Sequence, residues 1–234
     1  MKIPRLLPAL PIVAGLLLLG RIGLAADQDV GALVAALFKA RNDRALGIVT
    51  ARVYAEPSRP GAGPAPQASV LIHLVPYSAA FEANLDAVRT GLRDSLGGYT
   101  RAVSLVEESR VDFERALVAA GGGALVRSEV TDAQGAVRLA DIPAGDWLML
   151  AWREAGHLTK SFKRSEQDLK RYPDVPTTTT YSMVTYWRVR VTVSRGETAE
   201  VAMNDRNVWM TAPRQEGATS TRPRAPGTGT QKRR

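Results

Sequence analysis

The chain has 234 residues, a formal net charge of +8 and no cysteine. The lack of cysteine excludes a disulfide framework, and it excludes a lipoprotein because lipid attachment after export needs a cysteine at the cleavage point. The basic excess lies in the first 25 residues and after residue 210, so the part between them is electrically balanced. A basic end on a neutral body indicates contact with anionic cell-surface polymers, or no contact at all, rather than binding of nucleic acid.

The N-terminal residues have the order of features of a secretory signal peptide. Lys2 and Arg5 precede an almost wholly apolar run from Leu6 to Leu19, and Gly23 and Ala25 are small residues suited to a cleavage site. The apolar run is shorter than the roughly 20 residues that span a bilayer. We therefore expect residues 1–25 to be cleaved, with a retained anchor as the alternative. The mature protein is expected to be periplasmic or extracellular, without a stable membrane span.

Residues 26–122 combine helical and strand patterns. Apolar residues with the spacing of one helical face predict a short amphipathic helix over residues 28–42, within an N-terminal segment 26–45. Alternation predicts strands over Leu46–Ala55 and Ala68–Val75, with a Pro- and Gly-rich loop between them. From Ser78, a suitable N-cap, the period becomes helical. Two helical runs separated by Gly97 and Gly98 predict an inserted helical hairpin over about 78–122.

Strand patterns return after the predicted hairpin. Three short strands, over Ala124–Val130, Ala136–Ala140 and Trp147–Trp152, are joined by two tight turns and predict a β-meander. A long loop is predicted over residues 153–181. Strict alternation over Met183–Ser194 predicts a strand that turns and returns over Thr198–Met203, the last strand expected. Residues 211–234 are poor in large apolar side chains and predict a disordered basic tail.

The segment from Thr131 to Met149 has the pattern T-D-x-x-G, followed by a strand, then I-P-x-G-x-W-x-M. It resembles the turn motif of carboxypeptidase regulatory-like domains, which are similar to transthyretin and to the B-type repeats of bacterial surface adhesins. The resemblance implies an exported bacterial protein. The implied fold is mainly β: an antiparallel transthyretin-like or immunoglobulin-like β-sandwich over residues 46–210, with an inserted α-helical hairpin and a short N-terminal helix. The residues expected to form its turns and core position are Asp132, Gly135, Pro143, Gly145 and Trp147.

The chemistry-bearing residues do not form a catalytic pattern. A catalytic zinc site without cysteine would need both histidines, His73 and His157, together with a carboxylate. His73 lies within a predicted strand and His157 within the predicted loop, so a sheet position and a solvated position are expected for them. Transthyretin-like hydrolases also use histidines and arginine, but their Tyr-Arg-Gly-Ser type of C-terminus is absent. We expect no enzyme activity, no metal and no cofactor, and keep a transthyretin-like hydrolase as a minor alternative.

Two clusters remain as candidate binding features. One is a basic loop with two aromatic residues, suited to an anionic glycan or lipid headgroup and formed by Lys160, Phe162, Lys163, Arg164, Lys170, Arg171 and Tyr172. The other is a set of aromatic side chains, Tyr181, Tyr186 and Trp187, which could stack on sugars, although Trp187 is expected in the core. The predicted function is a non-catalytic exported module with a structural or binding role at the cell envelope or outside the cell. The alternative is a carbohydrate-binding accessory protein. The expected partner is a cell-envelope protein or a polysaccharide.

Overall fold

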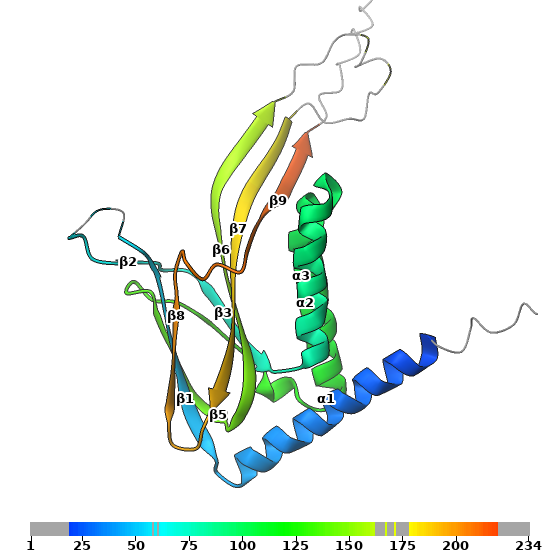
Figure 1. Ribbon diagram of the computed structural model, residues 1–234, viewed down its shortest axis with the longest axis vertical. Coiled ribbons are helices and arrows are strands. Elements are labelled where there is room, and N and C mark those ends of the chain that lie inside the picture. Colours follow the sequence, from blue (N-terminus) through cyan, green and yellow to red (C-terminus); the bar gives the residue numbers. More distant parts are fainter. Residues whose placement is uncertain are drawn as a thin grey trace, which may run out of the picture.

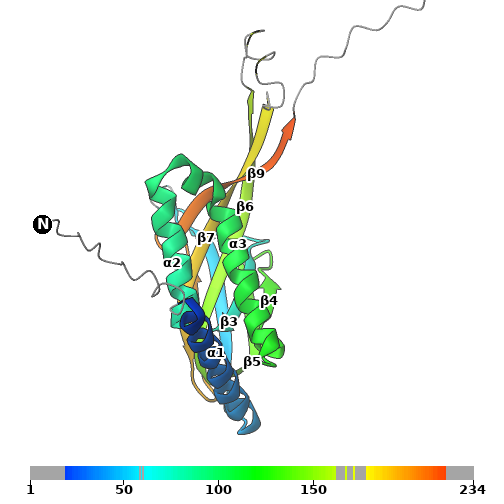
Figure 2. The same cartoon turned by 90° about the vertical axis from the view of Figure 1, so that its right-hand side faces the viewer.

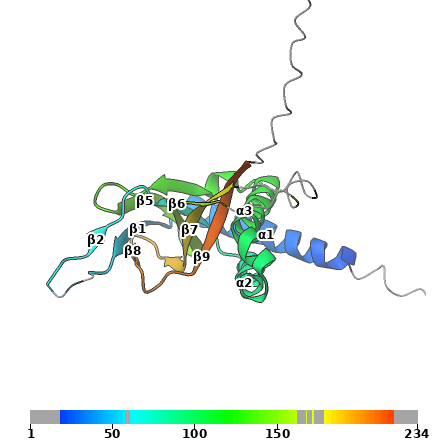
Figure 3. The ribbon, with the colours of Figure 1, turned by 90° about the horizontal axis from the view of Figure 1, so that it is seen from above.

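The computed structural model describes residues 19–57, 59, 61–161, 167, 171 and 178–219. The described chain is mainly β, with two sheets and three α-helices. Seen from above, the sheets lie face to face and two of the helices cover the outer face of one sheet (Figure 3). None of the helices in the described ranges is both long and apolar enough to span a membrane.

The four-stranded sheet is built around β1 (Leu46–Ala55). β1 pairs antiparallel with β5 (Ala136–Pro143) and with the short β2 (Ala65–Pro66), and parallel with β8 (Thr198–Met203). The alternation expected for β1 is confirmed, because Val49, Ala51 and Val53 are fully buried while Arg52 is exposed. One face of this sheet therefore lies on the core and the other faces solvent.

The five-stranded sheet has the order β4-β3-β6-β7-β9. Its strands are β3 (Leu71–Pro76), β4 (Arg127–Val130), β6 (Gly145–Ser161), β7 (Thr178–Val193) and β9 (Met210–Thr219), and all neighbours are antiparallel. In Figure 1 the upper ends of β6, β7 and β9 project beyond the helices.

The predicted β-meander is wrong, because its strands divide between the two sheets. β4 and β6 both pair with β3, whereas β5 pairs with β1 in the other sheet. The turns carry the chain from one sheet to the other, and they use backbone conformations that allow this: Gly135 has φ 68° and Gly145 has φ 150°. The two turns were correctly located, but a turn does not determine with which strand its neighbours pair.

Two helices lie against the outer face of the five-stranded sheet (Figure 2). α2 (Ala79–Asp94) begins at the expected N-cap, since the Ser78 side chain accepts a hydrogen bond from the Phe81 amide. α3 (Leu96–Ala119) follows after Ser95, which caps it, so Gly97 and Gly98 lie inside its first turn and do not break the helix as expected. Gly98 has another role: a Cβ there would lie 2.2 Å from the Gly91 carbonyl oxygen, so only glycine allows the helices to approach at this position.

The N-terminal helix is longer than expected. α1 (Leu19–Asn42) starts before the predicted cleavage position and runs through it. Val30, Val34 and Leu37 are buried, as the predicted apolar face requires, and Leu37 lies beside Gly145, where a Cβ would come within 2.8 Å of it. Residues 1–18 of the predicted signal peptide lie outside the described part of the chain.

Two segments predicted to lack regular structure contain strands. β6 continues to Ser161 and β7 begins at Thr178, so much of the predicted loop 153–181 is a paired ribbon. Residues 211–219, expected in the disordered tail, belong to β9 at the edge of the sheet. Pro213 is tolerated there because an edge strand has one side that needs no ladder hydrogen bonds. The remaining tail residues, 220–234, lie outside the described chain.

Candidate functional site

The face of the five-stranded sheet that meets α2 and α3 is rich in charge. Arg188 and Arg190 of β7 point toward α2, where the Arg188 guanidinium lies 2.9 Å from Asp86 and 3.8 Å from Glu82. Arg190 forms an ion pair with Glu82. Aromatic rings lie under both guanidinium groups: Arg188 is 4.9 Å from the Trp209 ring centre and Arg190 is 4.0 Å from that of Tyr77.

This cluster perturbs the ionisation of Glu82. Burial acts to raise its pKa, but hydrogen bonds from Arg190 and Tyr77 and the charges of both arginines lower the pKa below its usual value. A carboxylate whose pKa is lowered by folding stabilises the fold above its usual pKa, and that stabilisation is lost as the pH falls through the folded value. The cluster therefore fastens α2 to the sheet at neutral pH.

A second cluster joins α3 to the opposite part of the same sheet. His73 of β3 is 3% exposed, and its Nδ1 lies 2.7 Å from the Ser128 hydroxyl of β4. Its Nε2 lies 2.9 Å from the Glu114 carboxylate of α3. Arg110 forms an ion pair with the same carboxylate, and its guanidinium lies over the Trp152 ring at 5.6 Å.

The protonation of His73 follows from its partners. Burial, which outweighs the charge of Glu114, lowers the pKa of His73 and favours the neutral ring. Nδ1 shares a hydrogen bond with the Ser128 hydroxyl, whereas Nε2 lies close to the Glu114 carboxylate without a well-aligned hydrogen bond to it. The result is a row of serine, histidine and carboxylate groups in close contact.

These three residues follow one another in the order of a nucleophile, a base and an orienting acid. Ser128, however, lies on an edge strand and is exposed to solvent. Arg110 also neutralises the carboxylate. His73 is a buried residue of the sheet, the position that the sequence predicted, with Nδ1 hydrogen-bonded to Ser128 and Nε2 facing the Glu114 carboxylate.

A third ion-pair cluster attaches β9. Arg214 pairs with Glu107 of α3 and with Glu154 of β6, and Glu154 also accepts a hydrogen bond from Ser182. These contacts explain why a segment of low hydrophobicity is ordered as a strand. Next to them, the Tyr186 hydroxyl is buried without a hydrogen-bond partner among the described residues, and burial raises its pKa.

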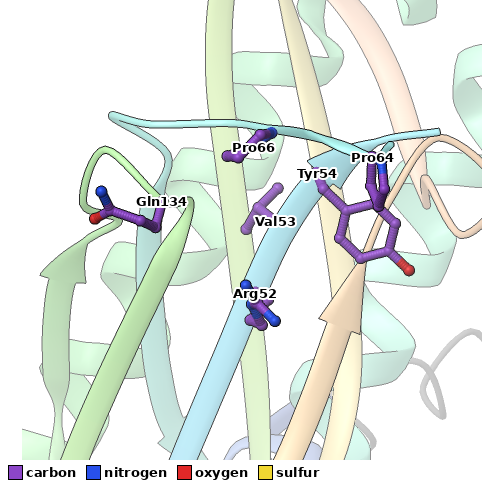
Figure 4. A pocket seen from close by; sticks show the side chains of 6 residues that line it. All are labelled: Arg52, Val53, Tyr54, Pro64, Pro66 and Gln134. Carbon is purple, nitrogen blue, oxygen red and sulfur yellow. The ribbon is translucent and has the colours of Figure 1, made fainter. Parts of the chain in front are cut away.

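A solvent-facing pocket lies at the end of β1, on the outer face of the four-stranded sheet (Figure 4). Its volume is about 290 Å³, near the lower end of the range of roughly 300–1,000 Å³ for ligand pockets. Arg52, Val53 and Tyr54 come from β1, Pro64 and Pro66 from the loop around β2, and Gln134 from the turn between β4 and β5.

The Tyr54 ring is held in place by neighbouring hydrogen bonds. Its hydroxyl accepts a hydrogen bond from the Asn204 amide at 3.1 Å, and the same amide group donates to Glu56 at 2.9 Å. Asn207 in turn accepts from the Asn204 backbone amide at 2.7 Å. The pocket therefore has one aromatic wall whose orientation is fixed before any ligand arrives.

The structure brings few of the predicted binding residues together. Of the basic loop, Lys160 lies in β6 and Arg171 is exposed, while Phe162, Lys163, Arg164, Lys170 and Tyr172 lie outside the described residues. The aromatic platform does not form, because Tyr186 and Trp187 are 2% and 1% exposed, which leaves Tyr181 alone partly accessible. Trp187 is in the core as expected, and its indole donates to the Asn204 carbonyl.

The two histidines are far apart. His73 pairs with Leu150, whereas His157 lies further along β6, past a bulge, and pairs with Ser182. At about 3.3 Å per residue this is a separation of roughly 20 Å along the strand. They cannot share one metal ion, and the described residues hold no group of three potential metal ligands.

The expected turn residues have the expected geometry. The Asp132 carboxylate accepts from the amides of Gln134 and Ala136, at 2.9 and 2.8 Å, and closes the turn that Gly135 completes. Trp147 is fully buried and its indole donates to the Pro143 carbonyl at 2.9 Å. These residues therefore serve folding rather than binding.

Comparison with known proteins does not assign the chain to a family. It matches no protein-family model and no curated protein. Among solved structures it is similar to a "putative carbohydrate binding protein" from Pseudomonas aeruginosa, with 16% identity, 68% of this chain and 88% of that chain covered, and a TM-score of 0.34. It is also similar to the pilus backbone from Streptococcus pneumoniae, with 12% identity, 47% of this chain and 31% of that chain covered, and a TM-score of 0.22. TM-scores this low assign no function, and neither likeness confirms the carboxypeptidase regulatory-like family.

Sequence reasoning missed the pocket at the end of β1. The alternation in β1 places Arg52 and Tyr54 on the solvent-facing side, directly before a Pro- and Gly-rich loop. A tyrosine on the polar face of a strand is a usable signal for an exposed aromatic surface. The remaining walls come from residues distant in sequence, so the pocket itself could not be predicted.

Proposed function

We propose that this chain is an exported, non-catalytic β-sandwich module with a structural or binding role at the cell envelope or outside the cell. The observation that carries the proposal is the pairing of the charged side chains between sheet and helices. Arg188, Arg190 and Arg214 are matched by acidic groups of α2, α3 and β6, and Glu114 by Arg110. Charges arranged in this way hold the helices and β9 on the sheet, which is a structural role.

The finer assignment is a carboxypeptidase regulatory-like sandwich with an inserted helical hairpin. Three features support it: the Asp132 turn, the Trp147 indole bonded to Pro143, and two consecutive helices between β3 and β4. The extra helices cover the face that carries Arg188 and His73, so a ligand site on that face would be blocked. Binding is then expected on the other sheet.

The second candidate is a carbohydrate-binding accessory protein. The pocket at the end of β1 favours it, because an oriented tyrosine beside polar side chains is a surface on which a sugar ring can stack and form hydrogen bonds. This candidate uses Tyr54 rather than the aromatic residues proposed from the sequence.

A polysaccharide pull-down with the mature chain, residues 26–234, tests whether the module binds glycans. Retention on at least one insoluble or immobilised polysaccharide, with loss on Tyr54→Ala, supports the carbohydrate-binding candidate. Retention that is unchanged in Tyr54→Ala but lost in Lys163→Ala/Arg164→Ala assigns binding to the basic loop instead. If no polysaccharide retains the protein, the structural role remains, and crosslinking in intact cells should then capture an envelope protein.

Export is tested separately by expressing the full chain in a bacterium and locating the product. The expected result is a periplasmic or secreted protein whose first residue is Ala26. Substitution Ala25→Arg removes the small residue before the cut and should leave the signal attached. A protein that keeps residues 1–25 and stays in the cytoplasm contradicts the proposal.

A further inference from the structure

We infer that the pocket at the end of β1 binds an acidic saccharide, with Tyr54 stacking on the sugar ring and Arg52 pairing with a carboxylate of a uronic acid. This inference rests on the proposed binding role and adds the site and the chemical class of its ligand. It follows from the surroundings of Arg52, the fixation of Tyr54 and the pairing of the neighbouring acidic groups with other cations.

Arg52 stands between two small residues on the outer face of the sheet. Its cross-strand neighbours are Ala136 of β5 and Ala202 of β8, which share its row in the register. Because alanine side chains are short, neither neighbour can reach or cover the guanidinium of Arg52. The side chain is exposed and has no ion-pair partner within the described ranges.

The free guanidinium differs from the other arginines of the fold. Arg188, Arg190 and Arg214 all face carboxylates of the helices or of β6, whereas Arg52 lines a pocket with Tyr54, Pro64 and Pro66. A planar guanidinium binds a carboxylate through two parallel hydrogen bonds. An unpaired arginine in a pocket with apolar walls therefore selects a ligand that has both an anionic group and an apolar face.

A pyranose ring with a carboxylate meets both requirements. Its C–H face stacks on an aromatic ring, its hydroxyls bond to amides, and its carboxylate projects from the ring edge. Tyr54 supplies the ring, held by Asn204, and Gln134 lines the opposite side of the pocket, where Figure 4 shows its exposed amide pointing away from Tyr54, so a change of side-chain rotamer would bring it to the ligand. The two prolines keep the third wall rigid, since their φ angles are fixed.

The acidic residue beside Tyr54 already has a cation. Glu56 accepts a hydrogen bond from the same Asn204 amide group that holds the Tyr54 hydroxyl, and its carboxylate lies 3.4 Å from the Arg206 guanidinium. One row further down the sheet, Glu200 of β8 and Arg138 of β5 both pair with Thr50 and carry opposite charges. Arg52, in contrast, has no acidic partner within the described ranges and can accept one from a ligand.

The test is a titration of the mature chain with an oligogalacturonate, a short polymer of uronic acid, and with a maltooligosaccharide of the same length as the neutral counterpart. We expect saturable binding of the acidic oligomer, at least tenfold tighter than that of the neutral one and weakened by added salt. Arg52→Gln should reduce affinity for the acidic oligomer tenfold or more and bring it close to the neutral one. Tyr54→Ala should reduce affinity for both.

Two variants serve as matched controls. Arg115→Gln removes an exposed charge from α3, and Tyr181→Ala removes the partly exposed tyrosine of β7; neither residue lines the pocket. Both should bind like the unchanged chain. Arg52 is exposed and has no ion-pair partner within the described ranges, so Arg52→Gln should keep the thermal midpoint of the parent and remain interpretable if Tyr54→Ala is destabilised.

The possible results distinguish the inferred saccharide site from the proposed binding or structural role. Tighter binding of the neutral oligomer overturns the acidic ligand class while a binding role stands. Acidic binding that survives Arg52→Gln but disappears in Lys163→Ala/Arg164→Ala overturns the site. Absence of binding to both oligomers overturns the inference, and leaves the structural role to be decided by the crosslinking experiment.

Discussion

The guanidinium of Arg188 in β7 lies 2.9 Å from the carboxylate of Asp86 in α2. Both residues belong to segments far apart in the chain, and the pair is extended by Glu82 and by the Trp209 ring. The Arg188 side chain is 13% exposed and that of Asp86 is 50% exposed, so solvent screens this contact less than it screens a fully exposed ion pair. The interface between helices and sheet is thus held by electrostatics in addition to apolar packing.

Arg188→Met should destabilise the fold by about 1–3 kcal/mol, because it leaves Asp86 without its cation and Glu82 with Arg190 alone. Urea unfolding with an unchanged m-value measures the loss. Arg115→Met is the control: the Arg115–Asp112 pair is exposed, with 72% and 69% of the side chains accessible, and should contribute less than about 1 kcal/mol. Equal effects of the two substitutions would contradict a specific role of Arg188.

His73 predicts a dependence of stability on pH. Burial lowers its pKa in the fold, so the unfolded chain takes up a proton first as the pH falls. Stability contributed by the neutral ring is present above the usual histidine pKa of about 6.5 and is lost below it, down to the folded value. Urea midpoints should therefore rise between about pH 5 and 7, the window below and around that usual value.

The histidine responsible is identified by two substitutions. His73→Gln should flatten the dependence in this window, at the cost of a lower stability at pH 7 because Ser128 and Glu114 lose their partner. His157→Gln should leave the slope unchanged. A slope that follows His157 instead would show that the buried imidazole is not the titrating group.

Gly135 should tolerate no side chain. It has φ 68°, and a Cβ would lie 2.2 Å from the Val53 carbonyl oxygen, a backbone atom that cannot move alone. Gly135→Ala is expected to cost about 3 kcal/mol or more, from strain and overlap together. Gly196→Ala is the control, with φ 76° but no atom within 4 Å of the added carbon, and should cost about 1–2 kcal/mol. Thermal or urea unfolding compares them.

Local patterns predicted β1, α2 with its Ser78 cap and the two turns around Asp132 and Gly145, because periodicity and turn chemistry act over a few residues. The pairing of strands could not be predicted from local patterns. β5 lies next to β1 and not next to β4, and this depends on contacts between distant segments. β9 has a proline, a glycine and little apolar surface, and its ladder with β7, the burial of Met210 and Ala212 and the ion pairs of Arg214 make it a strand.

The candidate sites were also predictable only where local patterns determine them. The polar face of β1 was visible in the alternation of Thr50, Arg52 and Tyr54, but Pro64, Pro66 and Gln134 complete the pocket from other parts of the chain. The charges of β7 were also visible as an alternating set, yet Arg188 and Arg190 turn out to face helices rather than solvent. Their partners, Glu82 and Asp86, had no sequence signal that linked them to β7.

The buried hydroxyl of Tyr186 is expected to destabilise the fold. Its ring packs in the interface and its hydroxyl is buried next to a cavity of about 10 Å³ that Glu107, Arg110 and Trp152 also line. A buried hydroxyl without a partner costs free energy, so Tyr186→Phe should leave stability unchanged or raise it by up to about 1 kcal/mol. The urea midpoint of the variant, measured against the parent at pH 7, decides the sign. Ser182→Ala is the contrast, because its hydroxyl donates to Glu154 and its loss should lower stability by about 1 kcal/mol. A loss of more than about 1 kcal/mol in Tyr186→Phe would mean that the hydroxyl is satisfied by a water molecule in the small cavity, which is close to the least volume that holds one.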